Sequence, residues 1–400
     1  MRRRRFGIPA VVVGGGVSGL AAIRALGRAG VPVYCVDDRK NEAMYSSYCK
    51  KSLVAPNISE DENLLRNTLL KIRPLASGAV LFPVSDSMAI HLSNLRNELE
   101  NYILTVSKKD ILETLINKKR FYETLTKQEV PHPITIYVED YETAMKISKR
   151  ITYPVYIRPS LSQQFSKIFQ IKGFVAKSEE ELLRYFKLTK DANLEVMIQE
   201  IILGPPTHHI FIDGYMDSET NPKAFFARQR LRMWPLAFGN STLCKSIAIK
   251  QVISQKEMVS RYLKSVNYSG IFSAEFKKDQ RDGIFKLLEI NSRTSAWFSA
   301  LSAKCGVNIM LIAYLNAIGK DTEYTDKYES DVKWLEIETE IKAVAGMISN
   351  GDLTITSWLS TLLQPNQEYF SFAKDDLDPF LVNLKRILIS FKKQFSKFIA

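Results

Sequence analysis

The sequence predicts a combined α/β and α+β fold in three successive parts. Over the first hundred residues, short apolar runs alternate with helical segments, as in a parallel sheet with crossover helices. From about residue 107 strands and helices follow one another less regularly, and after about residue 326 helical patterns dominate. A chain of 400 residues is long enough for roughly two or three domains. We therefore expect domains at 1–106, 107–325 and 326–400.

Composition narrows the classes of protein before any motif is considered. Hydrophobic residues make up 46% of the chain, so it can fill a core, and general disorder is excluded. The formal net charge of +12 suits an anionic partner, whether a nucleotide, a nucleic acid or an anionic membrane surface. The 4 cysteines are scattered, which argues against a disulfide scaffold or a zinc finger and fits a reducing, cytoplasmic compartment.

The N-terminal part is predicted to be a Rossmann-like domain. Ala10–Val13 is an apolar strand, Gly14–Gly19 a glycine turn, Leu20–Ala29 a helix and Val33–Val36 the next strand. The turn matches G-x-G-x-x-G, and Asp37 follows near the distance expected of a ribose-binding acid. Two interpretations stay open: a dinucleotide site, or a tight strand-to-helix turn that binds no cofactor.

The C-terminal part is predicted to be helical over Trp334–Met347, Ile355–Leu363 and Asp378–Ala400. In the last segment apolar residues recur every three or four positions, with lysines and arginines between them. Two interpretations remain for this segment. It is either a helix docked on the body of the protein, which we favour, or a basic amphipathic helix that makes weak contact with a membrane surface.

A polar cluster lies in a predicted hairpin of the middle part. Side chains alternate faces along a strand, so Glu289 and Asn291 share one face, and a central turn would place Glu275 opposite Glu289. Glu289 interrupts an apolar strand, where an unbound carboxylate is costly. Two carboxylates and an amide oxygen suit Mg²⁺, which completes its shell with phosphate oxygens and water. Arg293 lies two residues further on, within reach of the same phosphates.

Other polar residues stand at the ends of predicted strands. Arg158 ends an apolar strand, where a guanidinium can clamp a phosphate. Gln199 and Glu200 end another strand just before a Gly-Pro turn, a position suited to recognising an adenine or a ribose. Lys118 lies on a basic helix and by itself indicates little.

Taken in order, these segments resemble the ATP-grasp ligases. The resemblance is strongest to the carboxylate–amine ligase branch, near the D-aspartate ligases and the carbamoyl-phosphate-synthetase-like proteins. It implies a two-lobed ATP-grasp domain that follows a Rossmann-like pre-ATP-grasp domain. It extends over about residues 105–320 and rests on Asn117-Lys118, Val130-Pro131-His132-Pro133, Pro154 to Ser160, Ile198 to Gly204, Glu275, and Glu289 to Arg293.

The resemblance also implies roles for individual residues. Arg293 would neutralise the transferred phosphate, and Arg230 and Arg232, which alternate with Arg228 on a predicted strand, would bind phosphate and the substrate carboxylate. The implied ligands of Mg²⁺ are Glu275, Glu289 and Asn291, and the implied nucleotide ligands are Lys118, Arg158, Lys172, Gln199, Glu200, Ile201 and Ile202.

The chain departs from the ATP-grasp pattern in two places. Most family members carry a glycine-rich flap after the strand of Arg158, but residues 161–169 contain no glycine, so Lys167 or Lys172 would have to substitute. The residues after Gly204 include the pair His208-His209 where an acid is often found, and we expect ordinary strand residues there rather than a metal site.

The function implied is an ATP-dependent ligase that joins a carboxylate to an amine through an acylphosphate, with release of ADP and phosphate. The expected partners are ATP, Mg²⁺ and these small molecules, without nucleic acid, and homodimer formation is left open. Two alternatives are kept. One is an NAD- or FAD-dependent oxidoreductase that uses Gly14–Gly19, and the other is a non-catalytic nucleotide-binding or membrane-recruited scaffold.

Overall fold

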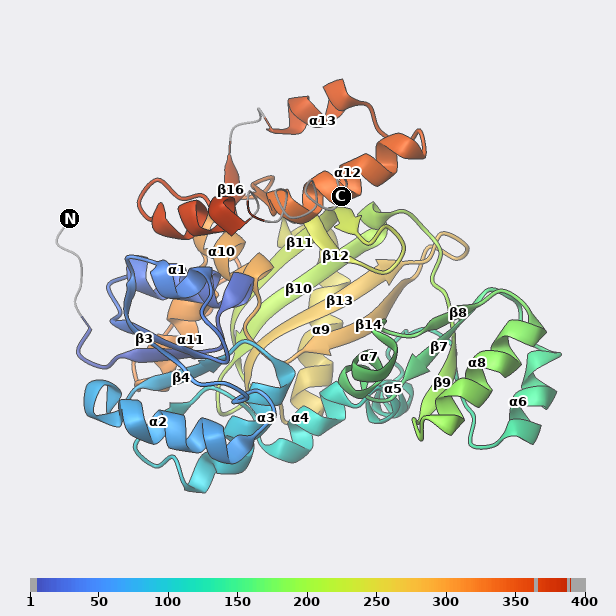
Figure 1. The fold of residues 1–400 in the computed structure, drawn as a ribbon, viewed down its shortest axis with the longest axis horizontal. Helices are drawn as coiled ribbons and strands as arrows, with labels where there is room; N and C mark the ends of the chain where they lie inside the picture. The colour runs from blue at the N-terminus through green and yellow to red at the C-terminus, as the bar shows by residue number, and fades with distance from the viewer. Residues whose placement is uncertain (1–5, 363–365, 387–388, 390–400) are drawn as a thin grey trace. The chain divides into compact units, whose positions relative to one another are not determined.

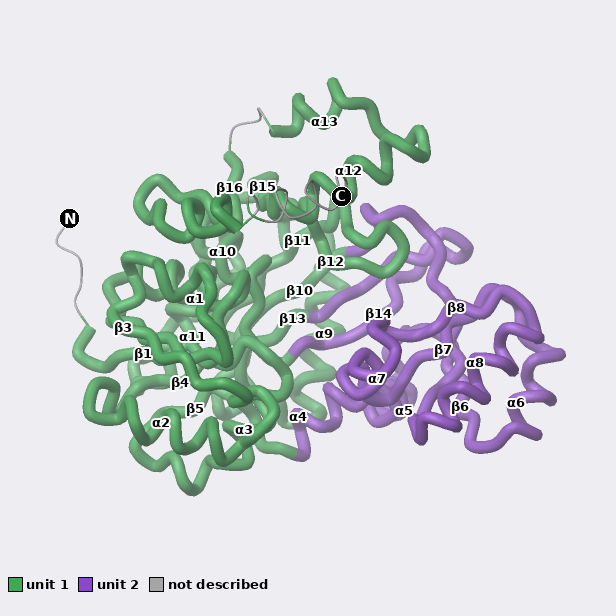
Figure 2. The backbone as a smooth tube through the Cα atoms, viewed as in Figure 1, with its two compact units in different colours: residues 1–109, 210–273, 292–400 green, residues 110–209, 274–291 purple. Residues whose placement is uncertain are grey.

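The computed structural model describes residues 6–362, 366–386 and 389. The chain forms two compact units (Figure 2). Unit 1 contains residues 1–109, 210–273 and 292–400, and unit 2 contains residues 110–209 and 274–291. Each unit is thus assembled from segments that are distant in the sequence. The division of the sequence into 1–106, 107–325 and 326–400 remains a proposal.

Unit 1 begins with a five-stranded parallel sheet of order β3-β2-β1-β4-β5. Its central strand β1 (Ala10–Val13) is buried throughout, which explains its uninterrupted run of apolar residues. Helices α1 (Gly16–Arg28), α2 (Glu62–Ala76) and α3 (Asp86–Asn94) alternate with the strands, which confirms the predicted Rossmann-like arrangement (Figure 1). The other strands are β2 (Val33–Asp37), β3 (Cys49–Val54), β4 (Val80–Pro83) and β5 (Ile103–Leu104).

One core of unit 1 joins this sheet to helices α10 (Ala296–Lys304) and α11 (Ile309–Ala317). Small side chains such as Ala21 and Ala25 on α1 allow α10 to pack closely against it. Among the described residues no single helix has the length and apolar composition to cross a bilayer. Helices α10 and α11 meet the requirements of length and apolar composition only when they are taken together, and a bend of 96° separates them. Apolar side chains of both helices belong to the core of unit 1.

A second, seven-stranded sheet has the order β14-β13-β10-β11-β12-β15-β16. The predicted hairpin is confirmed, because β13 and β14 are neighbours joined by a short turn. The sequence predicts a helix from Trp334, but Lys333–Leu335 instead form strand β15, since these residues pair with β12; helix α12 begins at Ile337. The bounds are β10 (His209–Met216), β11 (Pro222–Trp234), β12 (Asn240–Ile247), β13 (Gly270–Lys278), β14 (Phe285–Asn291), β16 (Gln367–Tyr369), α9 (Ile253–Ser265), α12 (Ile337–Ser349) and α13 (Ile355–Leu362).

Unit 2 contains a four-stranded antiparallel sheet of order β6-β9-β7-β8. Along β7 (Val155–Pro159), Val155 and Ile157 belong to the apolar core, so Tyr156 and Arg158 face the opposite side. The remaining elements are β6 (Thr135–Tyr137), β8 (Phe174–Ala176), β9 (Val196–Glu200), α4 (Lys109–Ile116), α5 (Lys118–Lys127), α6 (Tyr141–Ser148), α7 (Ser162–Phe169) and α8 (Glu179–Asp191).

The final predicted helix, Asp378–Ala400, is only partly described. Residues 378–386 are helical, and residues 387–388 and 390–400 lie outside the described part of the chain.

Candidate active site

Glu289 on β14 is the centre of a charged cluster in unit 2. One carboxylate oxygen lies 3.3 Å from the Lys118 Nζ and 3.6 Å from a terminal nitrogen of Arg158. The other oxygen accepts a hydrogen bond of 3.1 Å from the Asn291 amide. The charge of Lys118, and to a smaller extent those of Arg158 and Lys172, holds the pKa of Glu289 well below its usual range, although burial opposes this. The structure therefore brings together residues that lie far apart in the sequence.

The two nearest cations are held in place by neighbouring segments. Lys118 is buried at the start of α5, where its backbone N–H donates to the Ser160 carbonyl at 2.9 Å. Arg158 donates to the Gln199 side chain at 3.3 Å, and its guanidinium lies 5.7 Å from the ring centroid of Tyr122. The cations are therefore positioned before any ligand binds, which reduces the cost of ordering them.

Glu275 supplies the second carboxylate of this region. It accepts a hydrogen bond of 2.7 Å from Nδ1 of His209, which places that histidine beside a predicted metal ligand. Arg158 interacts electrostatically with Glu275 as well as with Glu289. Lys118, Arg158 and Lys172 together carry three positive charges, and Glu275 and Glu289 carry two negative charges. The net positive charge favours a ligand with several negative charges.

The oxygen atoms of Glu275, Glu289 and Asn291 fit the chemistry of Mg²⁺. Carboxylate and amide oxygens are the ligands that this ion prefers, and it commonly takes its remaining ligands from phosphates and water. Within the described residues no group of three or more His, Cys, Asp or Glu side chains is arranged to hold a metal by itself. The residues present therefore fit a metal that arrives with a phosphate-bearing ligand.

Gln199 and Glu200, which the resemblance predicts to contact the nucleotide, lie at the end of β9 in different environments. The buried Gln199 side chain bridges Arg158 and the Thr135 hydroxyl. The Glu200 carboxylate accepts hydrogen bonds of 2.8 Å each from Arg281, Lys286 and the Ile134 backbone N–H. Glu200 thus stabilises the turn after β13. Ile201 and Ile202 follow as irregular chain, and the predicted contacts of all four residues with the nucleotide stay predictions.

The glycine-free flap is a short helix. Strands β7 and β8 pair in antiparallel fashion, and their connection contains α7. Phe165 of α7 is buried in an aromatic cluster, with ring centroids 4.8 Å from Phe169 and 5.2 Å from Phe174. Side-chain packing therefore replaces the flexible backbone of a glycine loop. Lys172, just after this helix, is one of the cations that act on Glu289.

The arginines of β11 lie in unit 1, and two of them are engaged in buried ion pairs. Arg228 contacts Asp213 at 2.8 Å. Arg232 donates to Glu340 of α12 at 2.6 Å, and neither side chain is accessible to a small substrate. Arg230 donates to the Ser241 hydroxyl at 3.0 Å. The Glu340 carboxylate thus already contacts the Arg232 guanidinium, and the catalytic roles predicted for Arg230 and Arg232 stay predictions.

In unit 1, two buried hydroxyls that the sequence motifs do not indicate lie on either side of Arg293 in the chain. The Arg293 Nε donates to Asp86 at 3.0 Å. On either side, the hydroxyls of Ser292 and Ser295 are buried without a hydrogen-bond partner, and Ser295 is the N-cap of α10 but makes no capping bond. Buried unsatisfied hydroxyls at a helix N-terminus suit an anion. The run of hydroxyl residues before an alanine-rich helix is the signal by which the sequence could have revealed this feature.

The glycine turn after β1 is filled by side chains of the protein itself. The Gly15 N–H donates to the Asp37 carboxylate at 2.9 Å, and the Gly16 N–H donates to the Asn41 side chain at 3.0 Å. A Cβ atom added at Gly15 would lie 2.1 Å from the Asn41 amide nitrogen. These N–H groups are the ones that a dinucleotide pyrophosphate would need. In this structure the protein's own side chains occupy these N–H groups, which favours the interpretation of a tight strand-to-helix turn.

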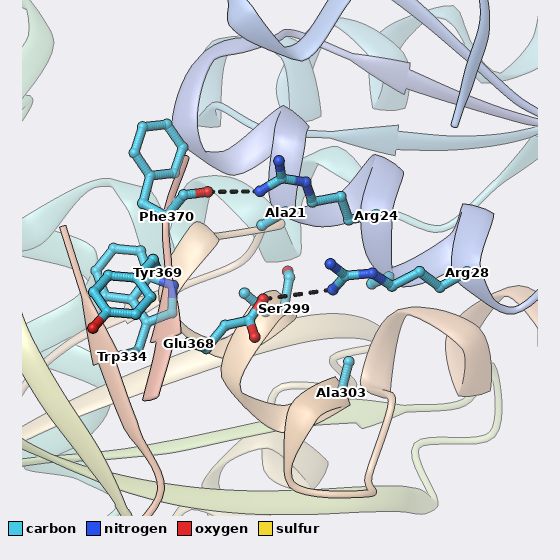
Figure 3. Close-up of a pocket in the computed structure, with 11 residues that line it drawn as sticks. Ala21, Arg24, Arg28, Ser299, Ala303, Trp334, Glu368, Tyr369 and Phe370 are labelled. Carbon is cyan, nitrogen blue, oxygen red and sulfur yellow. Dashed lines mark hydrogen bonds and ion pairs between the residues drawn. The ribbon is translucent and has the colours of Figure 1, made fainter. Parts of the chain in front are cut away.

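The pocket drawn in Figure 3 lies in unit 1 and contains none of the predicted site residues. Arg24 reaches from α1 to the Phe370 carbonyl at 2.8 Å, and Arg28 reaches Glu368 at 3.5 Å (Figure 3). Both arginines are already engaged by the protein. The pocket marks the place where the segment around β16 packs against α1.

Comparison with known proteins identifies relatives of low identity. No family model matches the chain. The D-aspartate ligase of Enterococcus faecium is 23% identical over 273 residues, which are 64% of this chain and 63% of that protein. The carbamoyl phosphate synthase large chain of Pyrococcus furiosus is 28% identical over 228 residues, which are 54% of this chain and 20% of that protein. The chain thus spans less than two thirds of the length of these relatives.

Solved structures match a larger part of the chain. Biotin carboxylase from Campylobacter jejuni, in a β,γ-ATP complex, has a TM-score of 0.65 at 17% identity and covers 82% of this chain and 74% of its own. N5-carboxyaminoimidazole synthetase from Staphylococcus aureus has a TM-score of 0.63 at 16% identity, with 83% and 82% covered. L-amino acid ligase from Bacillus licheniformis has a TM-score of 0.61 at 13% identity, with 83% and 79% covered. At these identities the likeness establishes a shared fold.

Proposed function

We propose that this chain, which has the ATP-grasp fold and resembles the carboxylate–amine ligases, is an ATP-dependent ligase. It would join a small carboxylic acid to a small amine and release ADP and phosphate. The observation that carries the proposal is the convergence of Lys118, Arg158 and Lys172 on Glu289, beside Asn291. This arrangement supplies both the cations for a polyphosphate and oxygen ligands for its metal.

In unit 2 the residues would bind and orient the triphosphate. Lys118 and Arg158 would exchange part of their contact with Glu289 for phosphate oxygens, and Lys172 would add a third cation. A bound Mg²⁺ would supply further neutralisation of phosphate charge, held by Glu289, Asn291 and Glu275. Positioning and charge neutralisation are the main requirements of phosphoryl transfer, so no side-chain nucleophile is needed.

In unit 1 the residues around Arg293 would bind the carboxylic acid. The buried hydroxyls of Ser292 and Ser295 and the N-terminus of α10 are the groups available for its negative charge. Asn291 and Ser292 are consecutive residues, so the proposed metal ligands and the proposed acid site are joined by one peptide bond.

The reaction would have two steps. A carboxylate oxygen of the acid attacks the γ-phosphorus of ATP, the bond from that phosphorus to the bridging oxygen breaks, and ADP leaves. The nitrogen of the amine then attacks the acyl carbon, the bond to phosphate breaks, and the nitrogen loses a proton as the amide forms.

An ADP-release assay with the full chain tests the proposed activity. MgATP is incubated with pairs of carboxylic acids and amines, amino acids included, and ADP is measured by chromatography. We expect release that requires both substrates, is lost in Lys118→Ala and is kept in Lys119→Ala. The neighbouring Lys119 is a matched control, because it pairs with Glu195 at the surface, at 2.9 Å. MgATP binding without ADP release from any pair would favour the scaffold alternative, and absence of MgATP binding would overturn the assignment.

A further inference from the structure

The carboxyl end of β4 lies where the strand order of the parallel sheet reverses. The order β3-β2-β1-β4-β5 means that the chain adds β2 and β3 on one side of β1 and then continues with β4 on the other side (Figure 1). In open parallel sheets, ligands bind outside the carboxyl ends of the strands at such a reversal. After β1, the N–H groups of the turn are bonded to Asp37 and Asn41. The end of β4 is therefore the place to look for a ligand.

Two segments meet at this end of β4 and bring opposite charges together. The Thr294 N–H donates to the carbonyl of Pro83, the last residue of β4, at 3.1 Å. This bond holds residues 292–295 beside the start of α3. Asp86, the first residue of α3, accepts a hydrogen bond of 3.0 Å from the Arg293 Nε. The Asp86 and Arg293 side chains are 29% and 23% exposed, so a small ligand can reach both.

The groups at this place suit a ligand that carries both a negative and a positive charge. The hydroxyls of Ser292 and Ser295 are buried without a partner, and Ser295 makes no capping bond at the N-terminus of α10, so these groups suit a carboxylate. Asp86 has Arg293 as its one hydrogen-bond partner among the described residues, which leaves its second oxygen for a donor. A carboxylate without a cation would be attracted by Arg293 but repelled by Asp86. An α-amino acid, which bears an ammonium and a carboxylate on one carbon atom, matches both residues.

We propose that the acid activated by this chain is an α-amino acid and that Asp86 selects it by binding its ammonium group. The inference rests on the proposed function, because it names the class of acid that the groups around Arg293 would hold. Asp86 would keep its bond to Arg293 through Oδ1 and accept an ammonium N–H at Oδ2. The alternative is that Asp86 only orients Arg293. In that case, removing its charge would affect acids with and without an amino group equally.

Binding of paired acids to the full chain tests the inference. The probes are alanine, aspartate and phenylalanine, each in L and D form, and propionate, succinate and 3-phenylpropionate, which lack only the amino group. Isothermal titration calorimetry measures their dissociation constants in Mg²⁺, with a non-hydrolysable ATP analogue and again without nucleotide. We expect at least one amino acid to bind about tenfold or more tightly than its analogue, because a hydrogen bond between two charged groups is gained. Asp86→Asn should remove this difference and leave the affinity for the analogue almost unchanged.

The variants are chosen so that a change in charge can be told from a damaged fold. Asparagine at position 86 keeps an oxygen for the Arg293 Nε, and Asp86→Glu, which keeps the charge, should retain a preference for the amino acid. The matched control is Glu62→Gln, which removes an acid from the first residue of α2, where it accepts a hydrogen bond from Asn94. This control should bind all the acids as the wild type does. Melting curves of the variants would show whether any of them is unfolded.

Two binding results would overturn the inference. One is that no amino acid among the probes binds more tightly than its analogue. The other is an equal loss of affinity for an amino acid and its analogue in Asp86→Asn, which would make Asp86 a residue that only orients Arg293. The ADP-release assay separates the inference from the proposed function. Equal release with an amino acid and its analogue would overturn the inference alone. Amino-acid binding that depends on Asp86, without ADP release from any pair of acid and amine, would overturn the proposed function and support the assignment of Asp86.

Discussion

Replacing Glu289 by glutamine should change ATP affinity in opposite directions with and without magnesium. In the absence of a ligand the carboxylate lies 3.3 Å from Lys118 and 3.6 Å from Arg158, so it engages the cations that are proposed to bind phosphate. The same carboxylate is a proposed ligand of the metal. Removing the charge of Glu289 therefore frees the two cations to bind phosphate but weakens the binding of the metal. Measuring ATP affinity without magnesium separates these two effects.

The size of each effect follows from the geometry. An interaction that involves a charged group contributes about 1.5–3 kcal/mol, or roughly 10- to 150-fold in affinity, so binding in excess Mg²⁺ should weaken by about that factor. Without metal, the uncharged side chain in the Glu289→Gln variant would no longer repel the phosphates. Two unit charges about 5 Å apart in water interact by about 0.8 kcal/mol, so ATP should bind about fourfold tighter. The value for water is a lower bound, because the Glu289 side chain is only 29% exposed.

Isothermal titration calorimetry of ATP, in excess Mg²⁺ and in EDTA, measures both affinities. Glu195→Gln is the matched control, because its side chain is 54% exposed and pairs with Lys119 away from the cluster. It should behave as the wild type in both buffers. An equal loss of affinity by Glu289→Gln in both buffers would refute the metal assignment, since only the magnesium-dependent part should fall. Melting curves would show whether such a loss came from damage to the fold.

Three further predictions concern other parts of the chain. Arg158→Ala should weaken ATP binding by about ten- to a hundredfold and leave adenosine binding almost unchanged, because its cation is proposed to contact phosphate alone; a competition assay with both ligands decides this. Asp376→Asn removes one partner of the buried pair with Arg24 and should cost about 3–5 kcal/mol of stability in thermal unfolding, whereas Asp375→Asn, at a more exposed pair, should cost much less. Hydrogen bonds from its neighbouring arginine hold the pKa of Asp279 well below its usual range. The ionised Asp279 carboxylate therefore stabilises the fold fully above its unfolded pKa of about 4, and this stabilisation is lost as the pH falls below that value. Asp279→Asn should lower the melting temperature at neutral pH, and the melting temperature of the variant should fall less in acid than that of the wild type. Parallel profiles of melting temperature against pH for the two proteins would contradict this.

Two members of the charged cluster around Glu289 could be predicted from local sequence. Arg158 and Glu289 are charged residues in apolar strands, where an isolated charge is costly, whereas Lys118 was indicated only by the resemblance. Such signals need only a few neighbouring residues to be recognised. The order of the segments then indicated that they meet in space, and the structure brings Lys118 and Arg158 each within 4 Å of Glu289.

Partners that are distant in the sequence could not be predicted in this way. Arg232 has the same local pattern as the other arginines of its strand, but Glu340, which lies 108 positions later, occupies its guanidinium. The glycine turn has the pattern of a dinucleotide site, and the contacts of Asp37 and Asn41 that fill it become visible only in the folded chain. In both cases the sequence showed a polar group but not the group that satisfies it.

The contact between Arg24 and Asp376 has a consequence for how the protein is made. These residues are 352 positions apart, and the other acceptors of the Arg24 guanidinium, the carbonyls of residues 370, 371 and 376, are equally distant. During synthesis the guanidinium has none of these partners until residue 376 has left the ribosome. Because an unpaired buried cation is costly, Arg24 is expected to stay hydrated until this segment arrives and covers it. The part of α1 that the segment covers is therefore exposed through most of translation, a period in which apolar surface is open to aggregation and to chaperones.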